Sequence, residues 1–306
     1  MEPKLGGSLA VPIVQELAKE QLTRVPARYV RPDPHPQMIL SDLSSIPQIP
    51  VINMQKLSDK FSMDSELQAL HDACKQWGLF QIFYGTVWRI AIYVPQLTLF
   101  EIKIANVDQP WDGGCCGGEM KDVVEVYCIN RKFLPGKIVK LMAKALDMKY
   151  EEMETLFAEG MHSTRMNYYP PCPQPELVTG LCPHSDAVGL AILLQANEME
   201  GLQIKKDGVW IPVSPLPNAF IVIVGDILEI LTNGAYKSVE HRAVVNSKKE
   251  RLSVATFLNP KLDVDLGPAA SLVTPGTPAK FKRIGVTEYF KGYFSRELGV
   301  NHIWIS

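Results

Sequence analysis

The sequence predicts a mainly β fold with flanking helices (α+β), in which a jelly roll or a similar sandwiched β architecture follows a helical N-terminal part. From Arg165 onward, short apolar runs alternate with turn residues, a spacing that is typical of sandwiches and barrels. Before that point, the apolar residues recur at the intervals of amphipathic helices.

The expected strands are short and closely spaced. Leu202–Ile204 and Val209–Ile211 alternate on either side of Asp207-Gly208, a dipeptide that favours the tight turn of a β-hairpin. Further runs that we expect to form strands are Ile49–Ile52, Phe220–Val224, Ala243–Val245 and Val254–Phe257.

Three earlier segments have helical periodicity. Val11–Leu22 suits one short helix, and the prolines after it favour an extended connector. Ser65 is expected to cap a helix with one apolar face, which Gly78 ends. A further helix, expected over Gly136–Met148, carries its apolar residues at the spacing of core packing.

The composition limits the classes of function. With 306 residues, 46% of them hydrophobic, the chain can bury the core of one large domain. The net charge of −2 gives no electrostatic argument for nucleic acid or an anionic membrane as a partner. Without a signal-peptide pattern, and with only six cysteines, we expect a cytoplasmic protein with free thiols. The oligomeric state stays unknown, because the sequence has no heptads or repeats.

Three side chains in the second half are candidates for a metal site. His184 and Asp186 are separated by one residue, so in an extended strand both project from the same face. Together with His241 they provide the ligand set that holds non-haem Fe(II) and leaves coordination positions open. An isolated His-x-Asp triplet binds metal in only about one case in ten, and His241 alone could be a core histidine. The β-like runs beside each element favour the metal interpretation.

A second pair of side chains suits an anion. Arg251 and Ser253 have the same spacing, which directs a guanidinium and a hydroxyl at one group, most simply a carboxylate. Taken alone, Arg251 could also end a solvated turn, since charged residues precede it.

These residues fall within segments that closely resemble the plant Fe(II)- and 2-oxoglutarate-dependent dioxygenases. The segments are Asn167–Pro175, Pro183–Asp186, Asn233-Gly234, Glu240–Asn246 and Arg251–Ser253. Within that family, the chain looks most like the branch of specialised metabolism with senescence-related, codeine/thebaine O-demethylase-like and norcoclaurine-synthase-like proteins.

The resemblance implies a double-stranded β-helix (jelly roll) core and an oxidoreductase that uses Fe(II), 2-oxoglutarate as cosubstrate and ascorbate as reductant. It implies that the iron ligands are His184, Asp186 and His241. It implies that the cosubstrate residues are Arg251 and Ser253, which bind the distal carboxylate, with Tyr169 and Asn167 helping to position it. The partners would be O2 and a small plant metabolite that is hydroxylated or O-demethylated, with release of succinate and CO2.

The chain also departs from the family pattern. We expect an N-terminal dioxygenase region over 1–135, with 82–131 atypical, then the Fe(II)/2-oxoglutarate dioxygenase jelly-roll domain over 136–298 and an atypical tail over 299–306. The middle of the chain looks shortened. Ile223 stands where a polar residue is frequent, and Ala191 stands where a threonine is common. These departures leave the iron and cosubstrate residues whole and alter the expected substrate wall and lid.

Two alternatives stay open. Some relatives use the same iron triad without 2-oxoglutarate, as the ethylene-forming and penicillin-ring-forming enzymes do, and their Arg-x-Ser pair serves a different carboxylate. A truncated homologue could also fold and bind a ligand without turning it over. The substrate is not decided by the sequence, because the expected pocket-lining residues come from the atypical segment.

Overall fold

The computed structural model describes residues 17, 19–20, 22–31, 47–83 and 134–295. The predicted helix Val11–Leu22 and the atypical segment 82–131 lie largely outside these residues, and the tail 299–306 lies entirely outside them.

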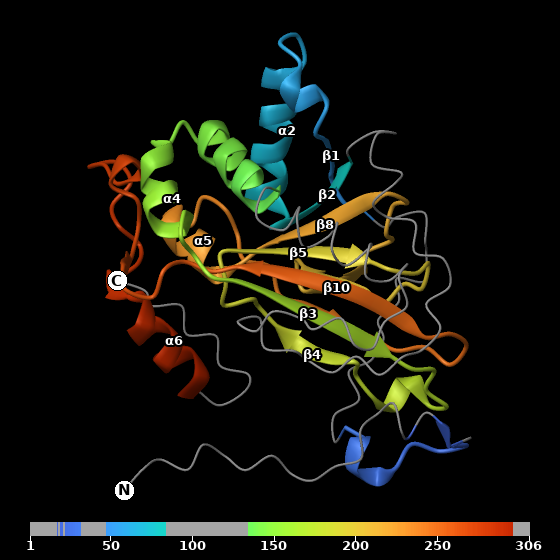
Figure 1. Cartoon of the computed structure of the whole chain (residues 1–306). Helices are drawn as coiled ribbons and strands as arrows, with labels where there is room; N and C mark the ends of the chain where they lie inside the picture. The colour runs from blue at the N-terminus through green and yellow to red at the C-terminus, as the bar shows by residue number, and fades with distance from the viewer. Residues whose placement is uncertain (1–16, 18, 21, 32–46, 84–133, 296–306) are drawn as a thin grey trace, which may run out of the picture.

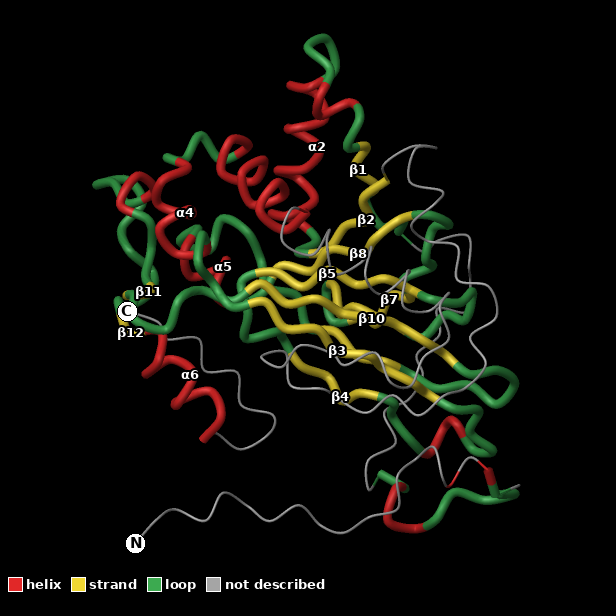
Figure 2. Tube along the Cα trace, viewed as in Figure 1, coloured by secondary structure: helices red, strands yellow, loops and turns green. Residues whose placement is uncertain are grey.

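Two β-sheets form the centre of the molecule (Figures 1 and 2). The large sheet has the order β1 (Val51–Asn53), β2 (Leu79–Phe83), β8 (Ala219–Val224), β5 (Leu190–Gln195), β10 (Arg251–Leu258) and β3 (His162–Tyr169). The small sheet has the order β4 (Leu181–His184), β9 (His241–Ala243), β6 (Leu202–Lys206) and β7 (Val209–Pro212). A separate ladder joins β11 (Asp265–Leu266) to β12 (Ile284–Gly285). The predicted jelly-roll class, a double-stranded β-helix with flanking helices, is confirmed.

Helices cover the outer face of the large sheet (Figure 1). The α-helices are α2 (Met63–Gln76), a helix over 134–145, α4 (Tyr150–Phe157), α5 (Asp226–Leu231) and α6 (Val286–Ser295). Short 3₁₀ turns are Ala27–Tyr29, Lys56–Ser58, Pro175–Leu177 and Ala270–Leu272. Apolar residues of α2, the 134–145 helix and α4 form one buried cluster with the outward-facing side chains of β2, β5 and β8. None of the helices in the described part of the chain has the length and apolar character that a membrane span requires.

The start of α2 differs from the prediction. The helix begins at Met63, so Ser65 lies inside its first turns, where its hydroxyl donates to the carbonyl of Ser62 (2.9 Å). The expectation that Ser65 caps the helix is therefore wrong. Its predicted end is confirmed, because Gly78 has a φ of 65°. A Cβ at Gly78 would lie 2.3 Å from the carbonyl oxygen of Lys237, so only glycine fits this close approach.

The predicted hairpin is confirmed, whereas several strand boundaries shift. Asp207 (φ 51°) and Gly208 (φ 81°) form the turn between β6 and β7, as a tight primed turn requires. The strand predicted over Ala243–Val245 ends at Ala243, because the chain then leaves the ladder and the Val244 amide donates to Gly201. The strand predicted from Ile49 begins at Val51, where pairing with β2 starts.

The space between the sheets changes character along the strands. Inward-facing residues of both sheets, including Leu193, Ala255, Ile204 and Ile211, form a second buried apolar cluster. Further along β5 and β10 the inward-facing pair is Gln195 and Ser253, so the interior becomes polar there. This polar part contains the residues described next.

Candidate metal and cosubstrate site

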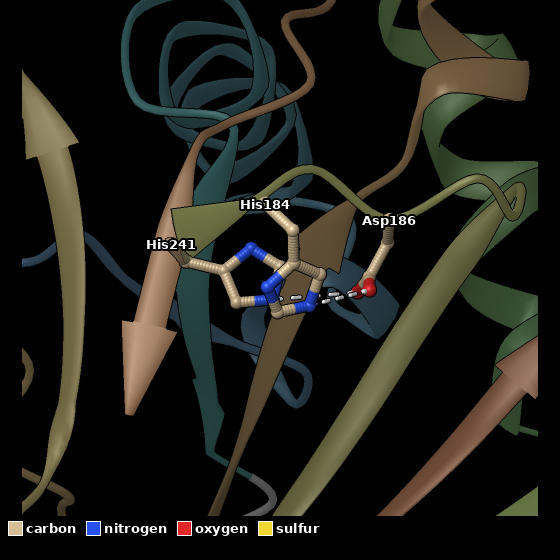
Figure 3. A group of neighbouring side chains, drawn as sticks. All are labelled: His184, Asp186 and His241. Carbon is tan, nitrogen blue, oxygen red and sulfur yellow. Dashed lines mark ion pairs between the residues drawn. The ribbon is translucent and has the colours of Figure 1, made fainter. Parts of the chain in front are cut away.

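Three side chains from separate places in the sequence converge (Figure 3). The structure brings together His184, Asp186 and His241, and the ligand atoms that they offer all lie within 4.8 Å of one another. Nε2 of His184 lies 3.5 Å from Asp186 Oδ1, and Nε2 of His241 lies 3.7 Å from Asp186 Oδ2. Two imidazoles and one carboxylate at this spacing suit a divalent cation such as Fe(II).

Neighbouring strands of the small sheet position the two histidines. His184 is the last residue of β4, His241 is the first residue of β9, and the two are partners across the ladder. Asp186 lies beyond β4, so the expectation that His184 and Asp186 project from one extended strand is wrong. Instead, the Asp186 carbonyl accepts a hydrogen bond from the amide of Asp226 (2.8 Å), which fixes the turn.

Each imidazole is oriented by a backbone carbonyl. His184 Nδ1 lies 2.7 Å from the carbonyl oxygen of Cys182, and His241 Nδ1 lies 3.1 Å from that of Val239. Because a carbonyl can only accept, Nδ1 must carry the proton in both rings. The Nε2 lone pairs are then free to bind a metal, and this second contact fixes the ring orientation.

The electrostatics of the three groups differ. Burial lowers the pKa of His241, although the charge of Asp186 opposes it. Burial raises the pKa of Asp186, but the His241 charge and the His184 hydrogen bond outweigh it, so the net shift is downward. Burial also lowers the pKa of His184, yet the hydrogen bond and charge of Asp186 raise it above the ordinary value. A neutral His241 and an ionised Asp186 are the forms that bind a metal.

A buried guanidinium lies on the large sheet. Arg251, 2% exposed, donates from Nη2 to Gln195 Oε1 (2.8 Å) and from Nη1 to Ser253 Oγ (3.3 Å). Its Nε is buried without a hydrogen-bond partner among the described residues. None of the ion pairs in the described part of the chain joins it to a carboxylate. A buried cation without a counter-charge is costly. This environment therefore suits an added anion, and the side chains fit a carboxylate.

Asn167 and Tyr169 lie beside this guanidinium because of the strand register. In the β3–β10 ladder, Tyr169 is opposite Arg251 and Asn167 is opposite Ser253. The Arg251 guanidinium carbon lies 5.3 Å from the centre of the Tyr169 ring, and Asn167 Nδ2 lies 3.5 Å from Ser253 Oγ. All four predicted cosubstrate residues thus face one part of the interior.

Two residues of this region were missed by the sequence analysis. Gln195 is one: it orients Arg251, and its own amide donates to the carbonyl of Met199. Arg165 is the other, on the same face of β3 as Asn167, with a charge that acts on both Asp186 and Tyr169. Alternation along β3 could have indicated Arg165. Gln195 has no local signal, because its role depends on the pairing of β5 with β10.

Comparisons with known proteins identify the family of this chain. The family model described as the 2OG-Fe(II) oxygenase superfamily matches residues 160–260. The oxoglutarate-dependent flavonoid 7-O-demethylase 1 of Ocimum basilicum is 47% identical over 337 aligned positions, which cover 96% of this chain and 90% of that protein. The codeine O-demethylase of Papaver somniferum is 41% identical and covers 96% of this chain and 95% of its own length.

A solved structure shows the same architecture. A crystal structure described as JOX2 in complex with 2OG, Fe and JA has a TM-score of 0.73 and 30% identity, with 94% of each chain covered. The 337 positions aligned with the Ocimum basilicum protein exceed the 306 residues here, so that relative has positions that this chain lacks.

Proposed function

Because this chain belongs to the 2OG-Fe(II) oxygenase superfamily, we propose that it removes an O-methyl group from a small methoxylated plant metabolite. It is an oxidoreductase that uses Fe(II) and 2-oxoglutarate. Two features of the structure support the proposed site. His184, Asp186 and His241 converge, and the buried Arg251 has no counter-charge among the described residues.

We assign His184, Asp186 and His241 as the iron ligands, and Arg251 with Ser253 as the residues that bind the distal carboxylate of 2-oxoglutarate. When bound, iron and 2-oxoglutarate supply the oxidation of a substrate C–H bond by O2, with release of succinate and CO2. Arg251 holds the cosubstrate in one orientation, which is a positioning effect. Tyr169, whose ring centre lies 5.3 Å from the guanidinium carbon, and Asn167 help to position the cosubstrate.

The substrate class is inferred from the relatives. Two of the similar proteins are named as O-demethylases, one for a flavonoid and one for codeine. Oxidation of a methyl carbon that is bound to oxygen gives a hemiacetal, which collapses to formaldehyde and a free hydroxyl. Demethylation therefore needs the same protein groups as hydroxylation. The expected partners are O2 and an apolar methoxylated compound, with ascorbate as reductant, in the cytoplasm.

The test is a product balance. The purified protein would be incubated with Fe(II), ascorbate, 2-oxoglutarate and either a 7-methoxyflavone or a methoxylated alkaloid. We expect succinate and formaldehyde in equal amounts, together with a product that has lost the methyl group. His241→Ala should give none of these products, because it removes one of the proposed ligands. A His241→Ala protein with full turnover would contradict the ligand assignment.

Other outcomes separate the alternatives. Succinate without formaldehyde, with a product that has gained oxygen, would indicate hydroxylation instead of demethylation. Turnover that does not require 2-oxoglutarate would indicate a relative that uses the iron triad alone. The third alternative is tested by an anaerobic titration, in which Fe(II) and 2-oxoglutarate together should produce a weak visible charge-transfer band. Folded protein that shows neither turnover nor this band would indicate a catalytically inactive homologue.

A further inference from the structure

A buried carboxylate lies behind the proposed metal ligands. Asp226, the first residue of α5, is 5% exposed. Its Oδ2 accepts a hydrogen bond from Ser185 Oγ (3.2 Å), and its Oδ1 accepts one from Ser238 Oγ (2.6 Å). Ser185 is the residue between the first two proposed ligands, and Ser238 lies in the segment that leads into the third. One carboxylate therefore contacts both ligand-bearing segments.

The backbone at the start of α5 contacts the same turn. The amide of Asp226 donates to the carbonyl of Asp186 (2.8 Å), and the amide of Ile227 donates to that of Val188 (3.2 Å). A Cβ at Gly225 would lie 2.1 Å from the Val188 oxygen, so the close approach requires glycine there. The turn that holds Asp186 is thus built directly on the first residues of α5.

The ladder between β4 and β9 is irregular. These strands are paired at Leu181 with Ala243 and at His184 with His241, and the register shifts between the two pairs. Of these two pairs, only the one between His184 and His241 lies at the proposed ligands. The hydrogen bonds of Asp226 act at the end of the ladder where the ligands are.

We propose that Asp226 is a positioning residue that holds the two ligand-bearing segments at the separation needed for metal binding. It does not itself contact the metal. This inference rests on the proposed iron ligands, and it adds a role for a residue behind them. Ser238 makes two hydrogen bonds to α5: its hydroxyl donates to Asp226, and its amide donates to Glu229 Oε2 (2.8 Å). The hydroxyl of Ser238 is therefore the group through which Asp226 acts on the His241 segment.

The test measures the affinity for Co(II), used alone as a stand-in for Fe(II), by competition with a chelating dye. Asp226→Ala should bind Co(II) about 10- to 100-fold more weakly, the range typical for loss of a group that orients metal ligands. Asp226→Asn should lose less, because the amide oxygen still accepts from one serine and its NH₂ can donate to the other. Ser238→Ala should show an intermediate loss.

The matched control is Thr232→Val at the other end of α5. The buried Thr232 hydroxyl donates to the carbonyl of Leu228 (2.7 Å) and accepts from the amide of Tyr236 (3.2 Å). Among the described residues, none of its hydrogen bonds reaches Ser185, Ser238 or a proposed ligand. We expect this variant to melt at a lower temperature and to keep the parent affinity for Co(II). A purely structural role for Asp226 would give the same result as Thr232→Val, and that outcome would overturn the proposal.

A coupling measurement strengthens the test. Ser185→Ala should weaken Co(II) binding in the parent and have no further effect in Asp226→Ala, which lacks the carboxylate that the Ser185 hydroxyl contacts. If Asp226→Ala does not fold, unchanged affinity in both Asp226→Asn and Ser238→Ala overturns the inference. A parent protein that binds no Co(II), as expected of His241→Ala, would overturn the proposed function as well. Equal binding by the parent and the Asp226 variants overturns this inference alone.

Discussion

Ala191 and Ile223, the two single residues at which the sequence departs from the expected family pattern, lie directly opposite each other on β5 and β8. Both are buried in the apolar cluster between the sheets. The small alanine faces the large branched isoleucine, so the side-chain volumes complement each other. The two departures thus form one apolar contact, and neither belongs to the polar set around Arg251.

The buried guanidinium gives the first prediction at the residue scale. Arg251→Ala should weaken 2-oxoglutarate binding by about 10- to 100-fold, because hydrogen bonds to charged groups contribute about 1.5–3 kcal/mol. Arg251→Lys should lose less, since it keeps the charge and loses only the planar fork of donors. The affinity would be measured anaerobically from the charge-transfer band with Fe(II). Arg283→Ala is the matched control, because it removes an arginine that donates to the carbonyl of Pro268. Equal affinities for 2-oxoglutarate in all variants would mean that its distal carboxylate does not bind Arg251.

Residues with a distinctive chemical type and short spacing, such as Arg251 and Ser253, could be proposed from the sequence, and the structure brings the two side chains together. The sequence was not sufficient where a contact depends on strand register or on a distant helix. Gln195 reaches Arg251 only because β5 pairs with β10. Asp226 reaches Ser185 only because α5 packs against the turn after β4. Neither relation leaves a pattern in the local sequence.

At the scale of elements, the β6–β7 hairpin depends on one glycine. Gly208 has a φ of 81°, and a Cβ there would meet no atom within 4 Å. Gly208→Ala should therefore lower the free energy of unfolding by about 1–2 kcal/mol through backbone strain alone. Urea unfolding would measure this loss, with turnover of the remaining folded protein unchanged. Gly285→Ala is the control, because its site is equally open and it lacks a positive φ; equal losses in both variants would refute the strain argument.

The helix α5 gives a prediction about pH. Burial raises the pKa of the Glu229 carboxyl above its ordinary value of 4.5, although the Ser238 amide and the charge of Lys237 oppose this shift. Between the ordinary and the raised value the folded chain binds more protons than the unfolded chain, so the contribution of Glu229 to stability is present below 4.5 and falls as the pH rises. Glu229→Gln removes this contribution.

The measurement is the difference in the free energy of unfolding between Glu229→Gln and the metal-free parent across a pH series. This difference should shift in favour of the variant as the pH rises above about 4.5 and become constant above the raised pKa. The glutamine side chain of the variant can still accept the hydrogen bond from the Ser238 amide. The comparison therefore measures the effect of the charge and not the loss of this hydrogen bond. The exposed Glu288→Gln serves as control. Parallel stability curves for Glu229→Gln and the parent would show that burial does not shift this carboxyl.

Element boundaries were predicted less well than element types. The helix expected over 136–148 occupies 134–145, and Asp147 instead adopts a positive φ of 51° in the following turn. Ser65 has the chemistry of a cap, yet the hydrogen-bonded turn begins earlier, where the Met63 amide donates to Asp59. Local side-chain type thus identifies a helix, whereas tertiary packing decides its first and last residues.

At the scale of the whole molecule, the proposed site is divided between the two sheets. The histidines belong to β4 and β9 of the small sheet, and Arg251 with its neighbours belongs to β10 and β3 of the large sheet. Asp186 lies in the connection from β4 to β5, which joins one sheet to the other. A cosubstrate that contacts both the metal and Arg251 therefore links the two sheets.

This arrangement predicts that metal and cosubstrate bind cooperatively. Saturating 2-oxoglutarate should tighten Co(II) binding by about tenfold, within the usual range of coupling between sites. Co(II) must then tighten 2-oxoglutarate binding by the same factor, which provides an internal check. 2-Oxobutyrate keeps the keto-acid group and lacks the distal carboxylate, so in the parent it should tighten Co(II) binding by a smaller factor. In Arg251→Ala, the factor for 2-oxoglutarate should fall towards this smaller value. Equal Co(II) affinities with and without 2-oxoglutarate in the parent would mean that the two sheets do not hold one shared ligand.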